Sequence, residues 1–331
     1  MFLLLGSSAK VILDVLVCFY ILFYILFTRK KINYVVLGAI IFLSIVHALL
    51  NQNPAEFIAT FLSLPLLLFP LYLIKIERFD NIVWVLLIIF LGVLSFSSLE
   101  SIAARSAGLT ASPTHLGLYA ALIASFYIVH GRFSSVVDLS LLCLMLIVAM
   151  FCVYASGSRG SALILGAVII HKVVLYCNKK PVISAFFLAA LLVVMLTALP
   201  KFGSLTEVRA LSYNSHSDER RFEQIVTYGL SNANTIFFGI GRANTGSVGV
   251  NLYRMFPSYY NTKPDSPESL LITLCISFGY FVGLTWFIAY LRFSKVKSRL
   301  FLCLPSLVFF QGLEGPLFFV LFTALHQFKR V

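Results

Sequence analysis

Long apolar segments constrain the fold of this chain more than any other feature of its sequence. Nine stretches carry about twenty mostly apolar residues each, which is enough for a helix to cross the ~30 Å hydrocarbon core of a bilayer. They are residues 11–28, 32–50, 55–74, 82–98, 113–130, 136–156, 160–177, 181–199 and 269–291. The tail, 299–328, is long for one span and is interrupted from Gly312 to Pro316, so one kinked helix and two short spans are both compatible with it.

The composition agrees with a membrane protein. Only 11% of the residues are charged and 60% are hydrophobic, whereas about a quarter of a soluble domain is charged. All six cysteines lie in or at the ends of apolar stretches, so neither a disulfide framework nor a cysteine metal site is predicted. The sequence thus predicts an all-α polytopic integral membrane protein, with about 10–11 transmembrane helices in a single membrane domain, residues 1–331.

The distribution of lysine and arginine predicts the orientation. If the spans alternate, most short basic connections fall on one side, which is then the cytoplasmic side. These connections carry Arg29 to Lys31, Lys75 and Arg78, Arg132, Lys179 and Lys180, and Arg292 to Arg299. The opposite side receives one large polar loop, 200–268, inserted before the ninth span, and the sequence predicts that this loop faces a periplasm or the cell exterior.

The large loop is basic, and this needs an explanation of its own. It carries Lys201, Arg209, Arg220, Arg221, Arg242, Arg254 and Lys263. The net charge of +12 does not indicate nucleic acid, because twelve of the 25 basic residues lie in these short inner connections. The loop cations instead favour an anionic, lipid-linked substrate at the membrane surface.

One segment of the loop has helical periodicity. Phe222, Ile225, Val226 and Gly229 recur at one-turn spacing after a serine cap, which predicts an amphipathic helix lying against the membrane or the spans. Arg220 and Arg221 on this helix either pair with the neighbouring acidic residues or face a substrate. His216 precedes the helix and is the loop's single histidine.

Three further short stretches carry possible chemistry. Arg105 lies in the outward connection before the fifth span. Its guanidinium contacts either lipid headgroups or a substrate there. Arg159 lies in the turn Ser156 to Ser161, at the start of the seventh span. The N-terminus of a helix together with an arginine can bind a phosphate group. The alternative is that Arg159 only anchors the span in its orientation. Arg242 follows Gly239-Ile240-Gly241, a Gly-rich backbone that can wrap a phosphate, although no strand leads into it and no Walker lysine follows.

The loop ends in a short acidic motif. Asp265-Ser266-Pro267-Glu268 has the serine cap and first-turn proline of an ordinary helix start. The alternative is that Glu268 or Asp265 lies at the water–bilayer boundary and acts as a general base or substrate ligand.

The order of these motifs along the chain resembles the O-antigen ligase and polymerase superfamily of bacterial envelope polysaccharide assembly. The resemblance extends from about Arg105 to Gly283 and includes the Ser-Arg-Gly turn, the large loop and its Gly-x-Gly. It implies an enzyme of lipopolysaccharide biosynthesis in the inner membrane, an inverting, metal-independent glycosyltransferase without a cofactor. The donor implied is undecaprenyl-diphosphate-linked oligosaccharide at the periplasmic face. Arginines of the outer loops would hold the diphosphate, with Arg159 the best match, then Arg220 or Arg221, then Arg105, and Arg242 as a further candidate.

One departure from the family pattern distinguishes its two branches. Ligases commonly carry a His-Asn pair before the span that follows the large loop, whereas this chain has Asp265 to Glu268 there. The departure favours an O-antigen polymerase over a ligase that transfers glycan to lipid A core, and it leaves the base open among Glu268, Asp265 and His216. Membrane lipid is an expected partner, and a chain-length regulator protein is a further candidate partner of a polymerase.

Other classes fit less well. A transporter or flippase of lipid-linked oligosaccharide would place charges mid-span along a pathway, and Asp14 is the clearest such residue here. A metal-dependent transferase that uses a polyprenyl-phosphate sugar would need paired acidic residues in an early outer loop, which Asn51 to Glu56 and Glu100 do not supply. A non-catalytic membrane scaffold is the remaining alternative.

Overall fold

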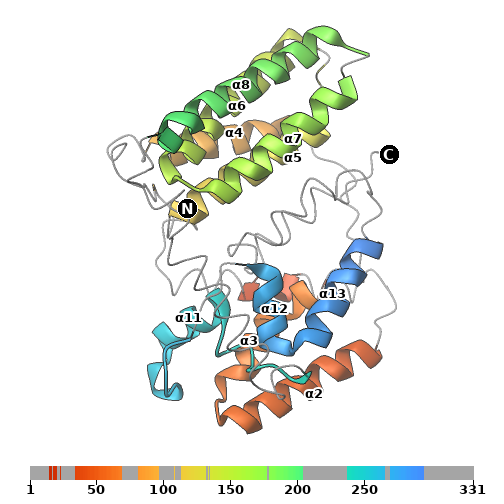
Figure 1. The fold of residues 1–331 in the computed structure, drawn as a ribbon, viewed down its shortest axis with the longest axis vertical. Helices are drawn as coiled ribbons and strands as arrows, with labels where there is room; N and C mark the ends of the chain where they lie inside the picture. The colour runs from red at the N-terminus through yellow and green to blue at the C-terminus, as the bar shows by residue number, and fades with distance from the viewer. Residues whose placement is uncertain are drawn as a thin grey trace.

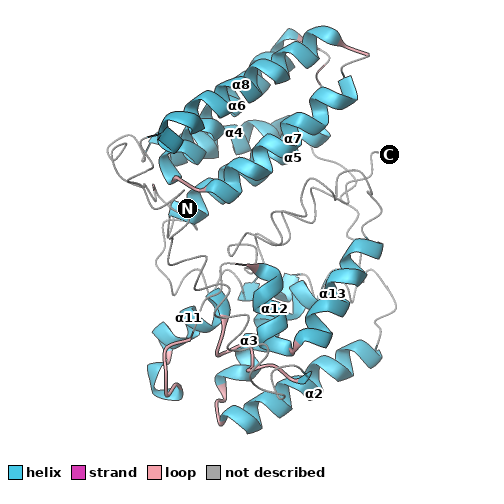
Figure 2. Ribbon diagram, in the orientation of Figure 1, coloured by secondary structure: helices cyan, strands magenta, loops and turns pink. Residues whose placement is uncertain are grey.

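The computed structural model describes eleven helical elements in sequence order (Figure 1). The described residues are 15, 16, 18–20, 23, 34–68, 81–96, 108, 113–131, 133, 135–176, 179–203, 237–264 and 269–293. Within these ranges the protein is all-α, with no strand (Figure 2), which confirms the predicted fold class.

The elements are α2 (Tyr34–Asn51), α3 (Ala55–Leu68), α4 (Asn81–Phe96), α5 (Pro113–His130), α6 (Val136–Ser156), α7 (Arg159–Tyr176), α8 (Pro181–Gly203), α11 (Gly246–Met255), the 3-10 helix η4 (Pro257–Tyr259), α12 (Leu270–Phe278) and α13 (Tyr280–Phe293). Helices α4 to α8 form one group, and α2, α3, α11, α12 and α13 form another (Figure 1). A continuous apolar core includes Leu122 and Met145 of the first group and Leu66 and Leu274 of the second.

Helix α6 shows the character of a membrane-crossing segment. Its 21 residues extend about 31 Å, and it is the one helix among the described residues long and apolar enough to cross a bilayer alone. Only 33% of its most apolar window is buried inside the protein, whereas the core helix of a soluble protein is mostly buried. Large apolar side chains such as Val137 and Ile147 are exposed. This pattern is consistent with an all-α membrane protein whose outer apolar faces contact lipid.

The ends of α6 follow from local sequence. Ser135 caps its start, where the Ser135 hydroxyl accepts from the Asp138 N–H and the Asp138 carboxylate accepts from the Ser135 N–H, both at 3.1 Å. Gly157 ends the helix in the left-handed region, at φ 59°. The serine cap fixes the start of α6, and the glycine cap fixes where the turn to α7 begins.

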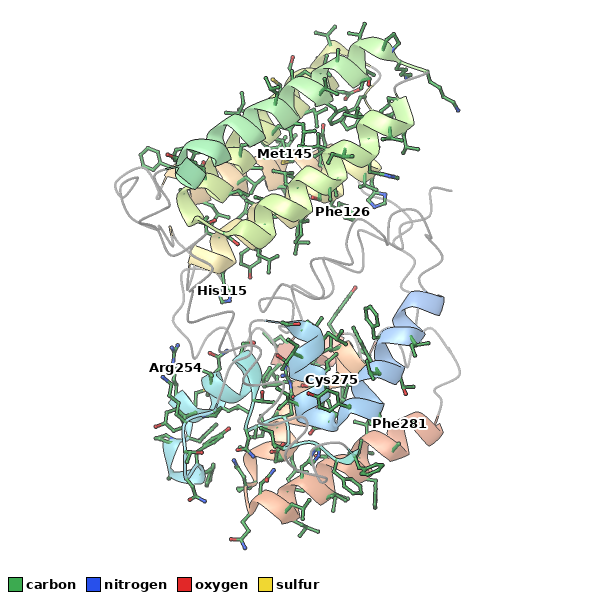
Figure 3. All side chains as sticks on the ribbon, in the orientation of Figure 1. His115, Phe126, Met145, Arg254, Cys275 and Phe281 are labelled. Atoms are coloured by element: carbon green, nitrogen blue, oxygen red, sulfur yellow. The ribbon has the colours of Figure 1, made fainter. Side chains whose placement is uncertain are left out.

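The single span predicted over 269–291 is wrong, because the chain breaks into two helices at Gly279. Gly279 has φ +90° and ψ 154°, a conformation open essentially to glycine alone. A Cβ placed on Gly283 of α13 would lie 2.8 Å from the Cα of Cys275 in α12. Residues eight apart in one continuous helix are about 12 Å apart, so the chain folds back at Gly279. Cys275 lies within this pair of helices (Figure 3).

A tryptophan joins this pair to α3. The indole Nε1 of Trp286 donates to the carbonyl oxygen of Leu66 at 2.8 Å. The residue four positions after Leu66 is Pro70, which has no N–H to offer that carbonyl. Trp286 thus supplies the donor that the sequence of α3 lacks, and it fixes α13 against α3.

We expect Gly279→Ala to destabilise the protein, because alanine does not tolerate this backbone conformation. The expected loss is about 1–3 kcal/mol in the free energy of unfolding, measured by thermal unfolding of the purified protein in detergent. Gly38→Ala in α2 is the matched control, since a Cβ there meets nothing within 4 Å. The control should be neutral or slightly stabilising, and equal behaviour of the two variants would show that the turn tolerates a side chain.

Candidate functional site

The structure describes two of the eight residues that the sequence nominates for chemistry. Arg159 is described in its backbone and Arg242 in full. The roles of the others stay predictions, because the residues lie outside the described ranges: Arg105, His216, Arg220, Arg221, Asp265 and Glu268.

Arg159 is the first residue of α7, at the end of a short serine-rich turn. The Ser158 N–H donates to the Ser156 hydroxyl at 3.2 Å, and the Ser161 hydroxyl donates to the Ser158 hydroxyl at 2.8 Å. All three serines are buried. These bonds hold the connection between α6 and α7 in one tight conformation, so the position of the Arg159 backbone is fixed.

The same turn lies against the start of α5. A Cβ on Gly117 would come within 2.4 Å of the Ser156 hydroxyl oxygen and 2.8 Å of the Ser161 hydroxyl oxygen. Only a glycine at position 117 allows this approach without a shift of the serines. The first turns of α5 and α7 therefore lie at the same end of the first helix group. The positive ends of both helix dipoles therefore lie there, and they favour an anion.

The second structural feature is the Gly-rich turn, Gly239 to Arg242. The N–H of Ile240 donates to the Ile276 carbonyl at 2.9 Å, and the N–H of Gly241 donates to the Ser277 carbonyl at 3.0 Å. Both carbonyls belong to the last turn of α12, where no N–H of the helix itself reaches them. The Gly-rich turn therefore caps the C-terminus of α12.

The other side of the turn contacts the end of α2. The Nε2 of His47 bonds to the Phe238 carbonyl oxygen, which places the ring proton on Nε2 because a carbonyl only accepts. One turn further along, the amide nitrogen of Asn51 donates to the Ile240 carbonyl at 2.9 Å. A segment that the sequence assigns to the large loop is thus bonded to a helix nearly two hundred residues earlier.

A buried carboxylate completes these contacts. Glu56, in the first turn of α3, is 0% exposed. Its Oε2 accepts from the Ala243 N–H at 3.0 Å. Its Oε1 accepts from the amide nitrogens of Asn51 at 3.2 Å and Asn244 at 3.4 Å. The group bound by the backbone at this turn is thus a carboxyl side chain of the protein itself.

Arg242 is also enclosed by protein. It is 0% exposed, and its Nε donates to the hydroxyl oxygen of Ser63 at 2.9 Å. Ser63 lies about two turns along α3 from Glu56, so the guanidinium extends along α3 into the interior. Binding of a diphosphate by Arg242 stays a prediction, and in this structure the side chain is part of the internal polar network.

The segment after the turn packs on the same part of α3. Val248 and Leu252 of α11 join Ala55, Ala59 and Leu62 in a small apolar cluster. Tyr260 lies at its edge; burial raises the pKa of the Tyr260 hydroxyl, and the negative charge of Glu56 raises it further.

Sequence reasoning did not nominate His47, Asn51, Glu56 or Ser63. The signal that was present is Glu56 itself, an acidic residue at the start of an apolar stretch, where a charge is costly unless it is paired or hydrogen-bonded. Nothing local indicates that its partners come from residues 240–244.

We expect Ser63→Ala to destabilise the protein, because it leaves the buried Nε of Arg242 without this acceptor. The expected cost is about 1–3 kcal/mol in the free energy of unfolding. Ser140→Ala is the matched control, since Ser140 and Ser63 each donate to the carbonyl four residues earlier, at 2.9 and 2.8 Å. The control should change stability by about 0.5 kcal/mol or less. Equal thermal unfolding of the two variants would contradict a stabilising role for the Arg242–Ser63 bond.

Comparison with known proteins adds one finding. A protein-family model described as O-Antigen ligase matches residues 143–287, which include the turn before α7, the large loop, α12 and most of α13. The match supports the resemblance to the O-antigen ligase and polymerase superfamily. Members of this family are membrane enzymes of the glycosyltransferase kind in O-antigen and polysaccharide assembly. No curated protein and no solved structure matches the chain.

Proposed function

We propose that this protein is an O-antigen type polymerase of the bacterial inner membrane. It transfers an undecaprenyl-diphosphate-linked glycan onto another lipid-linked repeat at the periplasmic face. The observation that carries this proposal is the family match over residues 143–287, which encloses both the Ser-Arg-Gly turn and the basic loop.

The chemistry is a displacement at the anomeric carbon. A hydroxyl of the acceptor sugar forms the new C–O bond, the bond to the diphosphate breaks with inversion, and the hydroxyl proton passes to a base or to water. Negative charge grows on the departing diphosphate, so guanidiniums fixed beside it stabilise the transition state more than the ground state. Arginine suits this task because its planar fork binds phosphate oxygens bidentately and keeps its charge near lipid.

The diphosphate ligands proposed are Arg159, Arg220, Arg221 and Arg105. Arg242 is proposed as a fifth, although its side chain would first have to leave the buried bond to Ser63. Two observations support Arg159: its place as the first residue of α7 and the buried serine bonds that fix its backbone. The α7 N-terminus adds its own attraction for an anion at the same end of the helix group as the start of α5.

The polymerase branch is supported by the sequence at the end of the loop. Glu268, Asp265 and His216 are the candidate bases, and the first two stand where ligases carry a His-Asn pair. A ligase is the second candidate, because the matching family model is described as O-Antigen ligase.

Lipopolysaccharide from a strain that lacks the gene separates these functions. Loss of a polymerase should leave lipid A core capped with a single repeat, and the intact gene should restore the ladder of longer chains. Bare core with accumulated lipid-linked polymer would indicate a ligase. Bare core with accumulated single lipid-linked repeats would indicate a flippase. An unchanged ladder would contradict all three.

We expect Arg159→Ala to abolish polymer while the protein remains abundant in the membrane. Loss of a preorganised charge-stabilising group typically lowers turnover by about 100-fold or more. Arg159→Lys should rescue poorly, because lysine lacks the bidentate fork. The measurement is polymer length and amount at matched protein level.

Lys180→Ala is the matched control, since Lys180 is an exposed cation directly before the start of α8, on the expected cytoplasmic side. It should leave polymer unchanged. Near-normal polymer from Arg159→Ala would reduce Arg159 to a topology anchor.

A further inference from the structure

Several of the residues that hold the Gly-rich turn come from outside the matched range 143–287. They lie on the α2–α3 corner, defined here as His47 to Glu56. We propose that Glu56 is a positioning residue of the glycan-transfer site: its carboxylate holds the Gly-rich turn and, through it, the placement of α11 and α12. The role of Glu56 in glycan transfer rests on the proposed function. The contacts between Glu56 and the turn do not depend on that function.

The hydrogen bonds of Glu56 exclude a direct chemical role in this structure. One carboxylate oxygen accepts from two amide nitrogens and the other accepts from a backbone N–H. The group is 0% exposed, so neither water nor a sugar hydroxyl reaches it. A general base must approach the proton that it removes within hydrogen-bond distance. Glu56 therefore acts through the backbone that it binds.

The two amides around Glu56 make the arrangement specific. Asn51 and Asn244 each donate to the carboxylate and also to the Ile240 carbonyl, at 2.9 and 3.0 Å. Glu56 and the Ile240 carbonyl are thus bridged by two side chains from distant parts of the chain. This closed set of bonds holds the turn from two directions, and each bond strengthens its neighbours where water is excluded.

The turn fits the carboxylate closely. Gly241 has φ +90°, and a Cβ there would lie 2.0 Å from the Oε1 of Glu56 and 2.7 Å from the amide nitrogen of Asn51. Both the backbone conformation and the space require glycine. The approach of an internal carboxylate therefore explains the second glycine of Gly-x-Gly. A Cβ on the first, Gly239, would lie 2.4 Å from the Ser277 carbonyl oxygen, so this glycine is required by the contact with α12.

The held turn determines where two elements of the matched range lie. Its N–H groups cap the C-terminus of α12, and α11 begins at Gly246, four residues after Arg242. Helix α12 follows directly after Asp265 to Glu268, the segment that carries two candidate bases. A shift of the turn would move the C-terminal support of α12, and this connects Glu56 to the proposed chemistry without direct contact.

The test uses two readouts on the full-length protein. One is glycan polymer made in the deletion strain at matched protein level. The other is hydrogen exchange of peptides covering 238–249, compared with peptides from α5. Glu56→Gln replaces one acceptor oxygen with an NH2 group that faces N–H donors. We expect the amount of polymer to fall, and the rate of hydrogen exchange at 238–249 to rise, each by about 10-fold or more. The reason is that buried N–H groups are left without acceptors.

A paired exchange separates positioning from chemistry. In Glu56→Gln with Asn244→Asp, the new amide of residue 56 donates to the new carboxylate at 244, the cluster keeps its net charge, and Asn51 still bonds the Ile240 carbonyl. We expect polymer to return to within about threefold of wild type and exchange to return with it, as coupled neighbours do in a double-mutant cycle. A carboxylate needed at position 56 for chemistry is not restored by this exchange.

Asp138→Asn is the matched control, because Asp138 is also a first-turn carboxylate that accepts a backbone N–H, at the start of α6. It should leave both readouts unchanged.

Three results would overturn the proposal. Glu56→Gln with wild-type polymer would show that the turn needs no such support. Loss of polymer that the paired exchange does not restore, although hydrogen exchange recovers, would assign Glu56 a chemical role. If Glu56→Gln does not accumulate, the paired variant must both accumulate and polymerise, and its failure to do so also overturns the proposal. If the wild-type gene does not restore the ladder of longer chains, the proposed function fails. Hydrogen exchange at 238–249 still tests whether Glu56 holds the turn.

Discussion

The second helix group depends on the need to satisfy backbone polar groups away from water. The Gly-rich turn lies between α2, α3 and α12. The N–H groups of its residues Ile240 and Gly241, and of Ala243 directly after it, each have an acceptor within the protein. An unsatisfied peptide group costs several kcal/mol in a medium without water, so irregular backbone is tolerated there only when the protein supplies every partner. The C-terminal carbonyls of α12 and the carboxylate of Glu56 supply them.

The same requirement explains why two charged residues are buried together. A lone carboxylate inside the protein would be strongly unfavourable, but Glu56 accepts three hydrogen bonds and lies at the positive end of α3. Arg242 in turn reaches Ser63 on the same helix. The network thus serves both charges along one side of α3, and it links this helix to the loop with a specificity that apolar contacts alone lack.

The helices could be predicted from local sequence far better than the contacts of the candidate site could. The predicted spans 113–130 and 136–156 coincide with α5 and α6, because Pro113, the Ser135 cap and Gly157 mark their ends within a few residues. The span 269–291 failed because average hydropathy is insensitive to one glycine with positive φ at position 279. The Gly-x-Gly stretch was interpreted as backbone that can wrap a phosphate, although no strand leads into it and no Walker lysine follows. Its partner in the structure, Glu56, lies 187 residues before Ala243. No local pattern connects residues at that separation.

That separation has a consequence for the order in which the chain is built. Ribosomes add about 5–20 residues per second, so the α2–α3 corner is complete roughly 10–40 s before the turn that binds it leaves the ribosome. During synthesis, Glu56 and Asn51 must be accommodated by water at the membrane surface or by the insertion machinery, since their later partners do not yet exist. Closure of this contact is therefore among the last events of assembly. It joins the early helices to the late ones only after most of the protein is already in the bilayer.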